Sequence, residues 1–178
     1  MEWKEQRIIK SCQKQDKKAQ KLLLQKYKNK FLGICLRYVN HQEIAEEILM
    51  DSFMTIFQKI NTYKKNSFEG WMKTIVIHKA IDYYRKHKND PIITNIDAEQ
   101  WQAPKKHQEN TLETQDLLSL LNTLPTGYRM VFNLYAIEGF SHKEIAAQLN
   151  ISTSTSKSQL HKAKLKLQES LLKGGYND

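Results

Sequence analysis

The sequence predicts an all-α fold made of two small helical domains joined by a flexible linker. Apolar residues recur at helical spacing over most of the 178 residues, and six glycines and three prolines are few for an all-β chain. Between Asn89 and Gln115 this periodicity disappears, over a length that is unusual inside one compact domain. We therefore expect a first domain over residues 1–88, a linker over 89–112 and a second domain over 113–178.

Two long amphipathic helices are predicted in the first domain. One runs from Ala19 to Val39, and its apolar positions follow one helix face: Leu23, Tyr27, Phe31, Ile34 and Tyr38. The other runs from about Glu43 to Ile60, and it turns a similar set toward a core: Ala45, Leu49, Phe53, Ile56 and Ile60. Its first half also carries acidic residues outside that set: Glu43, Glu46, Glu47 and Asp51. Asp51 lies too far along to compensate the helix dipole, so this acidic surface indicates a contact with something other than DNA.

A third helix is predicted to begin after Ser67, whose hydroxyl can cap it. Its first half supplies further apolar side chains: Phe68, Trp71, Met72, Ile75 and Val76. Its second half mixes cations with rings: His78, Lys79, Tyr83, Tyr84, Arg85, Lys86, His87 and Lys88. Rings that stack on bases and cations that follow phosphates suit single-stranded nucleic acid. Packing in the core is the alternative interpretation for some of these rings, and above all for Trp71.

The second domain is predicted to end in a helix-turn-helix. A leucine-rich helix stops at Pro125, and a further helix carrying Tyr128 and Phe132 ends near Gly139. Ser141 and Glu144 then fit a capping box, Asn150 suits a left-handed turn, and Ser152 can cap the last helix.

The last helix has two faces that differ in chemistry. Leu160, Ala163 and Leu167 should pack inward together with Ser156, whereas the opposite face is polar and mostly cationic: Lys157, Ser158, His161 and Lys162. Such a helix can enter the major groove of DNA, where its donors and acceptors meet base edges and its lysines meet phosphates. The alternative interpretation of this polar face is an ordinary solvated surface.

Composition narrows the classes of partner. The formal net charge of +9 favours a polyanion, and either nucleic acid or a membrane surface could use it. No signal peptide or spanning segment is recognisable, so we expect a cytoplasmic protein without direct membrane insertion. Cys12 and Cys35 form no Cys/His cluster, and no metal or other cofactor is expected.

Two other functional classes are compatible with parts of the chain. A DNA-binding regulator that acts as a dimer would use the helix-turn-helix, but the first domain offers no ligand pocket or heptad seam. A metal-dependent nuclease would need converging carboxylates, whereas Glu46, Glu47 and Asp51 lie along one exposed helix.

The motifs together resemble the sigma-70 family of bacterial RNA polymerase sigma factors, and within it the extracytoplasmic-function (ECF) group. Three stretches carry the resemblance: EIAEEILMDSFMTIF, SFEGWMKTIVIHKAIDYYRK and the segment from Leu124 to Leu167. They are similar to the acidic part of the second conserved region, its promoter-melting part, and the fourth region. Their order and spacing together are specific.

The resemblance implies a role in promoter-specific transcription initiation, without catalytic residues. It implies binding of Glu46, Glu47 and Asp51 to the β′ clamp helices of core RNA polymerase, and a contact with the β flap. It implies minus-10 recognition and duplex melting by Asn66, Ser67, His78, Lys79, Tyr83, Arg85 and Lys86. It implies minus-35 recognition by Thr155, Lys157, Ser158, His161 and Lys162. It also implies an anti-sigma factor as a partner.

Three positions depart from the family pattern. A common Arg-Asn pair of the melting helix falls on Ile77 and His78. The usual Gly-Thr-Val before the recognition face reads Ser154, Thr155 and Ser156, which places a hydroxyl where an apolar side chain normally packs. Gln159 stands in place of a frequent arginine.

Overall fold

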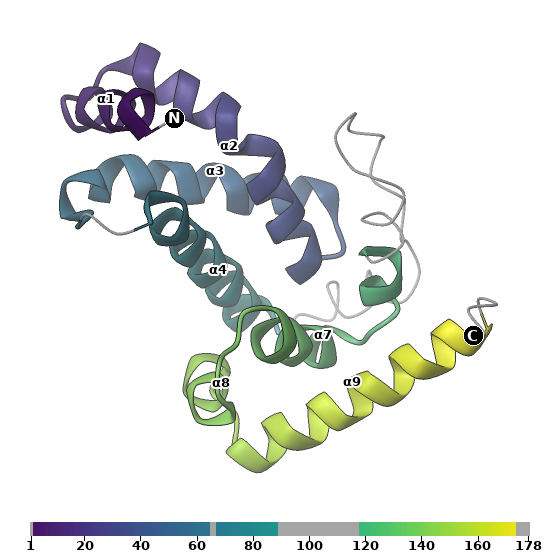
Figure 1. Cartoon of the computed structure of the whole chain (residues 1–178). Coiled ribbons are helices and arrows are strands. Elements are labelled where there is room, and N and C mark those ends of the chain that lie inside the picture. The colour runs from purple at the N-terminus through teal and green to yellow at the C-terminus, as the bar shows by residue number, and fades with distance from the viewer. Residues whose placement is uncertain (1, 65–66, 89–117, 174–178) are drawn as a thin grey trace. The chain divides into compact units, whose positions relative to one another are not determined.

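The computed structural model describes residues 2–64, 67–88 and 118–173, and all regular secondary structure in these ranges is helical (Figure 1). The all-α prediction is therefore confirmed for the part of the chain described. The chain forms two compact units, one from residues 1–35 and 43–80 and the other from 36–42 and 81–178. The predicted linker at 89–112 lies outside the described residues.

Helix α2 (Lys17–Tyr38) begins where a carboxylate caps it. Asp16 Oδ1 accepts hydrogen bonds from the backbone N–H of Lys18 at 2.8 Å and of Ala19 at 3.3 Å. The predicted apolar stripe from Leu23 to Tyr38 is buried throughout, as the helical spacing required.

Helix α3 (Gln42–Lys59) continues into the short 3-10 turn η1 (Ile60–Thr62). All five predicted core residues of α3 and η1 are buried, from Ala45 to Ile60. Phe53 meets Phe31 of α2 with ring centroids 6.1 Å apart, so two large rings join these helices at the centre of the first unit.

A first helix, α1 (Glu2–Gln13), precedes these two and was absent from the prediction. Glu5 Oε1 accepts hydrogen bonds from Lys26 Nζ at 2.8 Å and from Tyr27 Oη at 2.6 Å, which ties α1 to α2. These donors lower the pKa of Glu5 below its usual value. Cys12 is fully buried in this helix, and burial followed by the charge of Asp16 raises the pKa of its thiol to about 11.

Helix α4 (Phe68–His87) starts where the capping prediction put it. Ser67 Oγ accepts a hydrogen bond from the backbone N–H of Gly70 at 3.0 Å. Phe68, Met72 and Val76 are buried, whereas Trp71 is half-buried and stacks on Phe68 at 5.7 Å. Trp71 thus belongs to an aromatic cluster within the protein.

The C-terminal helices form a small core of their own. Residues 118–122 are helical, and they are followed by α7 (Thr126–Phe132), the π-helical turn η2 (Asn133–Ile137), α8 (His142–Leu149) and α9 (Thr153–Lys173). Leu121 and Leu124 pack with Ala163 and Leu167 of α9. Pro125 is the N-cap of α7, one position before its predicted place in the first turn.

Candidate protein and nucleic-acid interfaces

The acidic face of α3 is exposed. Glu46, Glu47 and Asp51 all lie on the surface, opposite the buried stripe that holds this helix in the first unit. Two methionines share that face, Met50 with 49% and Met54 with 59% of their surface accessible. Each of Glu47, Met50, Asp51 and Met54 stands three or four residues from another member of the set, so the four form one continuous strip.

Sequence reasoning missed the two methionines. The prediction divided α3 into core positions and acidic positions. Met50 and Met54 belong to neither set. Helical spacing could have revealed them. Met50 and Met54 are four residues apart and do not lie on the buried face, so both must be on the surface. The strip therefore combines negative charge with two polarisable, adaptable apolar side chains.

An ion pair links α3 to α4. Asp51 Oδ2 lies 4.0 Å from Lys79 Nζ, and both side chains keep much of their surface in solvent. This joins a residue expected at the polymerase to one expected at the DNA. An exposed pair at this distance contributes about 0 to 1 kcal/mol.

The end of α4 presents most of its predicted nucleic-acid residues to solvent. His78, Arg85 and Lys86 are exposed, and Ser67 is exposed at the start of the helix. Tyr83 is half-buried and stacks on His87, with ring centroids 4.4 Å apart. Asn66, the remaining predicted minus-10 residue, lies outside the described residues.

Ile77 and Tyr84 of α4 are less accessible than the cations near them. Ile77 is buried, so the first residue of the departing pair is a core residue in this chain, and only His78 remains on the surface. Burial also raises the pKa of the Tyr84 hydroxyl. Both tyrosines considered for base stacking, Tyr83 and Tyr84, are half-buried.

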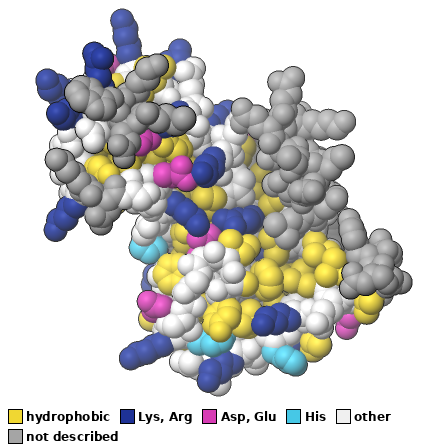
Figure 2. All heavy atoms as spheres, viewed as in Figure 1, with side chains coloured by type: hydrophobic (Ala, Val, Ile, Leu, Met, Phe, Trp, Pro, Cys, Tyr) yellow, Lys and Arg dark blue, Asp and Glu magenta, His cyan; other side chains and the backbone are white. Residues whose placement is uncertain are grey.

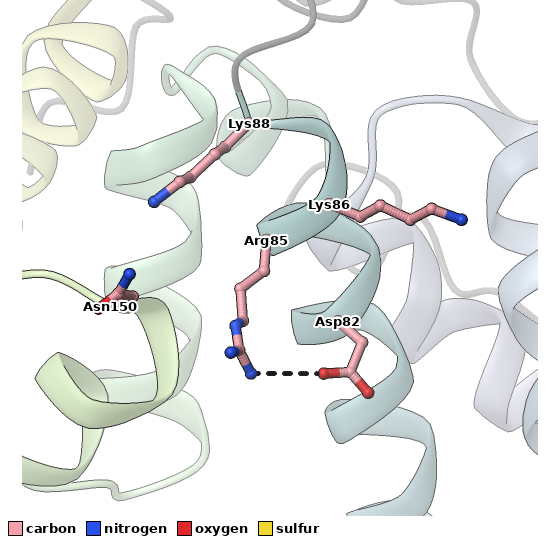
Figure 3. A pocket seen from close by; sticks show the side chains of 5 residues that line it. All are labelled: Asp82, Arg85, Lys86, Lys88 and Asn150. Atoms are coloured by element: carbon pink, nitrogen blue, oxygen red, sulfur yellow. Dashed lines mark ion pairs between the residues drawn. The ribbon is translucent and has the colours of Figure 1, made fainter.

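Polar side chains at the end of α4 line a hollow in the second unit. Asp82, Arg85, Lys86 and Lys88 surround it together with Asn150, and Arg85 Nη1 lies 3.7 Å from Asp82 Oδ1 (Figure 3). The cationic members give this hollow a positive lining. Figure 2 shows Lys and Arg side chains projecting at many points around the outline of the molecule.

The helix-turn-helix has the geometry that its sequence predicts. Ser141 Oγ accepts from the backbone N–H of Glu144 at 3.3 Å, and Glu144 Oε2 accepts from the backbone N–H of Ser141 at 2.8 Å. Asn150 adopts a left-handed conformation with φ 53° and ψ 55°. Ser152 Oγ then accepts from the backbone N–H of Thr155 at 2.9 Å and caps α9.

The predicted recognition face of α9 is on the surface. Lys157, Ser158, His161 and Lys162 are exposed, Thr155 is partly exposed, and Leu160, Ala163 and Leu167 are buried on the other side. Gln159 lies apart from this face. It is partly buried, and a side-chain carbon added at Gly127 of α7 would come within 3.2 Å of Gln159 Nε2.

Within residues 2–64, 67–88 and 118–173, no three His, Cys, Asp or Glu side chains gather where they could hold a metal ion. No helix in the same ranges combines the length and apolarity needed to cross a membrane.

These helices define a protein with a helix-turn-helix and a further helical unit whose core contains aromatic residues. Residues 23–89 match the family model for sigma-70 region 2, and residues 114–167 match the model for sigma-70 region 4. The chain belongs to the sigma-70 family, in its ECF group. It binds core RNA polymerase and promoter DNA and directs promoter-specific initiation of transcription, as the resemblance implied.

Relatives of the whole chain agree with this assignment. The ECF RNA polymerase sigma factor SigM of Bacillus subtilis is 29% identical over 161 residues, which cover 88% of this chain and 96% of SigM. The ECF RNA polymerase sigma-E factor of Escherichia coli K12 is 25% identical over 173 residues, with 90% of each chain covered. The sigma factor RpoE of Bartonella quintana, solved with the anti-sigma factor NepR, shares the fold with a TM-score of 0.54, 24% identity and coverage of 86% of this chain and 96% of RpoE.

Proposed function

We propose that three exposed surfaces of this sigma factor each bind a different target. The face of α3 with Glu46, Glu47 and Asp51 binds the β′ clamp helices. The end of α4 and the loop before it read and melt the minus-10 element, and α9 reads the minus-35 element. The domains extend over residues 1–88 and 113–178, with 89–112 as the linker between them.

The observation that carries this proposal is the separation of core from surface on each helix. On α3, α4 and α9 most of the predicted core positions are buried, while most of the residues assigned to a partner are exposed or partly exposed. Each helix can therefore offer its polar face without giving up packing. Sigma factors are non-enzymatic, and we assign this chain no catalytic residue.

The α3 strip suits a protein partner better than DNA. Glu47 and Asp51 would repel phosphates, whereas Met50 and Met54 offer apolar area that is costly to leave in water. A basic helical surface with some apolar side chains, as we infer for the β′ clamp helices, complements both properties. Met50 and Met54 thus join the three predicted acids in the proposed contact.

The end of α4 suits DNA in the process of opening. Arg85 and Lys86 are exposed cations that can follow the backbone, and His78 is exposed about two turns earlier on the helix. Extruding a base costs a few kcal/mol, which stacking and a pocket must offset. The Tyr83 ring, already stacked on His87, is our candidate for that stacking surface.

The face of α9 suits the major groove. Ser158 and His161 can exchange hydrogen bonds with base edges, and Lys157 and Lys162 add charge beside them. Thr155 lies at the capped start of the helix, where the backbone can also approach a phosphate. We further propose a contact between the second domain and the β flap.

An anti-sigma factor is the proposed negative regulator. RpoE of Bartonella quintana was solved with the anti-sigma factor NepR, and its fold matches this chain. We propose that a comparable protein occupies the polymerase or DNA faces when transcription is not required. The chain would act in the cytoplasm, where the polymerase is.

Run-off transcription with purified core polymerase tests these assignments. Asp51→Lys should lower the affinity for core polymerase at least tenfold, while Lys21→Glu, a charge reversal on the exposed surface of α2, should not. Lys157→Ala and His161→Ala should change the ranking of minus-35 sequences, while Lys21→Ala on α2 should leave the ranking intact. Equal effects of test and control variants would refute the surfaces, and tight sequence-specific binding without polymerase would favour a dimeric regulator.

A further inference from the structure

A buried hydroxyl joins the two helices of the helix-turn-helix. Ser156 of α9 is 0% exposed, and its Oγ lies 2.9 Å from Nδ1 of His142, the first residue of α8. Ser156 stands directly before Lys157 and Ser158 of the recognition face. The hydrogen bond therefore fixes α9 at the point where its base-facing surface begins.

The imidazole is held from a second side. His142 stacks on Tyr135 of the π-helical turn η2, with ring centroids 4.5 Å apart and planes 21° from parallel. Stacking restrains the face of the ring, and the hydrogen bond restrains its edge. Tyr135, His142 and Ser156 thus form a chain of contacts across η2, α8 and α9, which we call the strut.

The direction of the Ser156 hydroxyl distinguishes it from an ordinary helical serine. A serine within a helix commonly donates to the carbonyl four residues earlier, and the equally buried Ser52 of α3 does so, to Ile48 O at 2.6 Å. Ser156 instead reaches a side chain on another helix. Its hydroxyl makes a tertiary contact where an apolar residue would supply packing alone.

We propose that the strut positions α9 for sequence discrimination at the minus-35 element, with Ser156 and His142 as positioning residues that touch no DNA. Base-edge hydrogen bonds tolerate shifts of only about 0.5 Å, whereas lysines on long flexible stems still find phosphates after a small rotation of the helix. Loss of the strut therefore lowers specificity more than affinity. The inference rests on the proposed minus-35 role of α9.

Transcription by holoenzyme from promoters that differ by single bases in the minus-35 element tests the strut. His142→Phe keeps a ring for Tyr135 but removes the nitrogen, and Ser156→Ala removes the hydroxyl. Each should reduce the preference for the best promoter about fivefold, the amount that one net hydrogen bond allows. The double variant should lose no more than either single variant, because both remove the same bond.

Rescue and salt dependence separate positioning from simple destabilisation. His142→Asn places a polar atom near the position of Nδ1, and it should retain more of the discrimination than His142→Phe. The salt dependence of promoter binding should stay unchanged in all variants, since the phosphate contacts remain. Ser52→Ala, measured in parallel, shows the effect of removing a buried hydroxyl that makes no contact between helices.

Three results would overturn the strut. They are unchanged discrimination in His142→Phe and Ser156→Ala, additive losses in the double variant, or an equal loss in Ser52→Ala. Thermal unfolding of each variant identifies any that fail to fold, and the half-buried His142 provides the test if Ser156→Ala is one of them. Lys157→Ala and His161→Ala test separately whether α9 reads the minus-35 element. If neither variant changes the promoter preference, the proposed minus-35 face is refuted.

Discussion

The helices α2 to α4 and the helices α7 to α9 are stabilised by different means. Phe31, Tyr38 and Phe53 are almost completely buried among α2 and α3. Within residues 118–173, by contrast, no aromatic side chain is buried, and the core there consists of aliphatic residues. The polar residues Arg129, Asn133 and Ser156 are buried among them.

The short helices α7 and α8 account for part of the difference, although α9 in the same group has 21 residues. Helices of 22 and 18 residues can bury several rings along one stripe, while α8 has only 8 residues and three buried positions. A short helix has most of its backbone donors and acceptors near its ends, so caps matter more to it. We conclude that packing dominates in the first group and hydrogen bonding at helix ends has the larger share in the second.

The largest expected effect is the loss of a central ring from the α2 to α4 core. Phe53→Ala should lower the free energy of unfolding by about 3 to 5 kcal/mol, because the surrounding helices cannot fill the space that it leaves. Urea denaturation followed by circular dichroism measures this change. Met54→Ala, next to it but 59% exposed, is the control and should change stability by less than about 0.5 kcal/mol.

Loss of the α8 cap should come second. Ser141→Ala removes the hydroxyl of the capping box and should cost about 1 kcal/mol, since an amide at the helix start loses its partner. Hydrogen exchange of the α8 amides reports this locally. Ser67→Ala at α4 is the matched cap removal, and an equal loss of local protection in α4 would contradict the greater dependence of short helices on their caps.

Acid should weaken the same cap by a smaller amount. The Ser141 hydroxyl, and then its backbone N–H, lower the pKa of Glu144 in the folded protein below the usual 4.5. The stabilisation from ionised Glu144 is therefore complete above pH 4.5, and it declines as the pH falls through the lowered value. Hydrogen exchange of α8 between pH 5 and pH 3 should show this decline, and Glu144→Gln should remove it.

The smallest effect should come from the Asp51–Lys79 pair. A double-mutant cycle with Asp51→Asn and Lys79→Gln should give a coupling energy of about 0.5 kcal/mol or less, because both side chains are exposed. Thermal unfolding measures it. A coupling above about 1.5 kcal/mol would show that charge pairing contributes to this group of helices much more than packing alone suggests.

Much of the fold was predictable because local rules and tertiary packing agree in this chain. The stripe from Leu23 to Tyr38 could be buried only on one face, and a serine followed three residues later by a glutamate allows few alternatives at Ser141. Helix α1 escaped prediction because it is short and polar and is held in part by Glu5, whose partners lie in another helix. Its buried apolar residues are few, Ile9 and Cys12 among them, and its hydrogen bonds to α2 are distant in sequence.

The sequence by itself determined the helices, their caps, the left-handed turn at Asn150 and the polar faces of α3 and α9, because each depends on residues within one or two helical turns. Only the tertiary structure decided which polar groups meet. It paired His142 with Ser156 and Asp51 with Lys79, and it turned Gln159 toward α7. Such contacts depend on the distance and rotation between helices, which are set by the packing of many side chains at once.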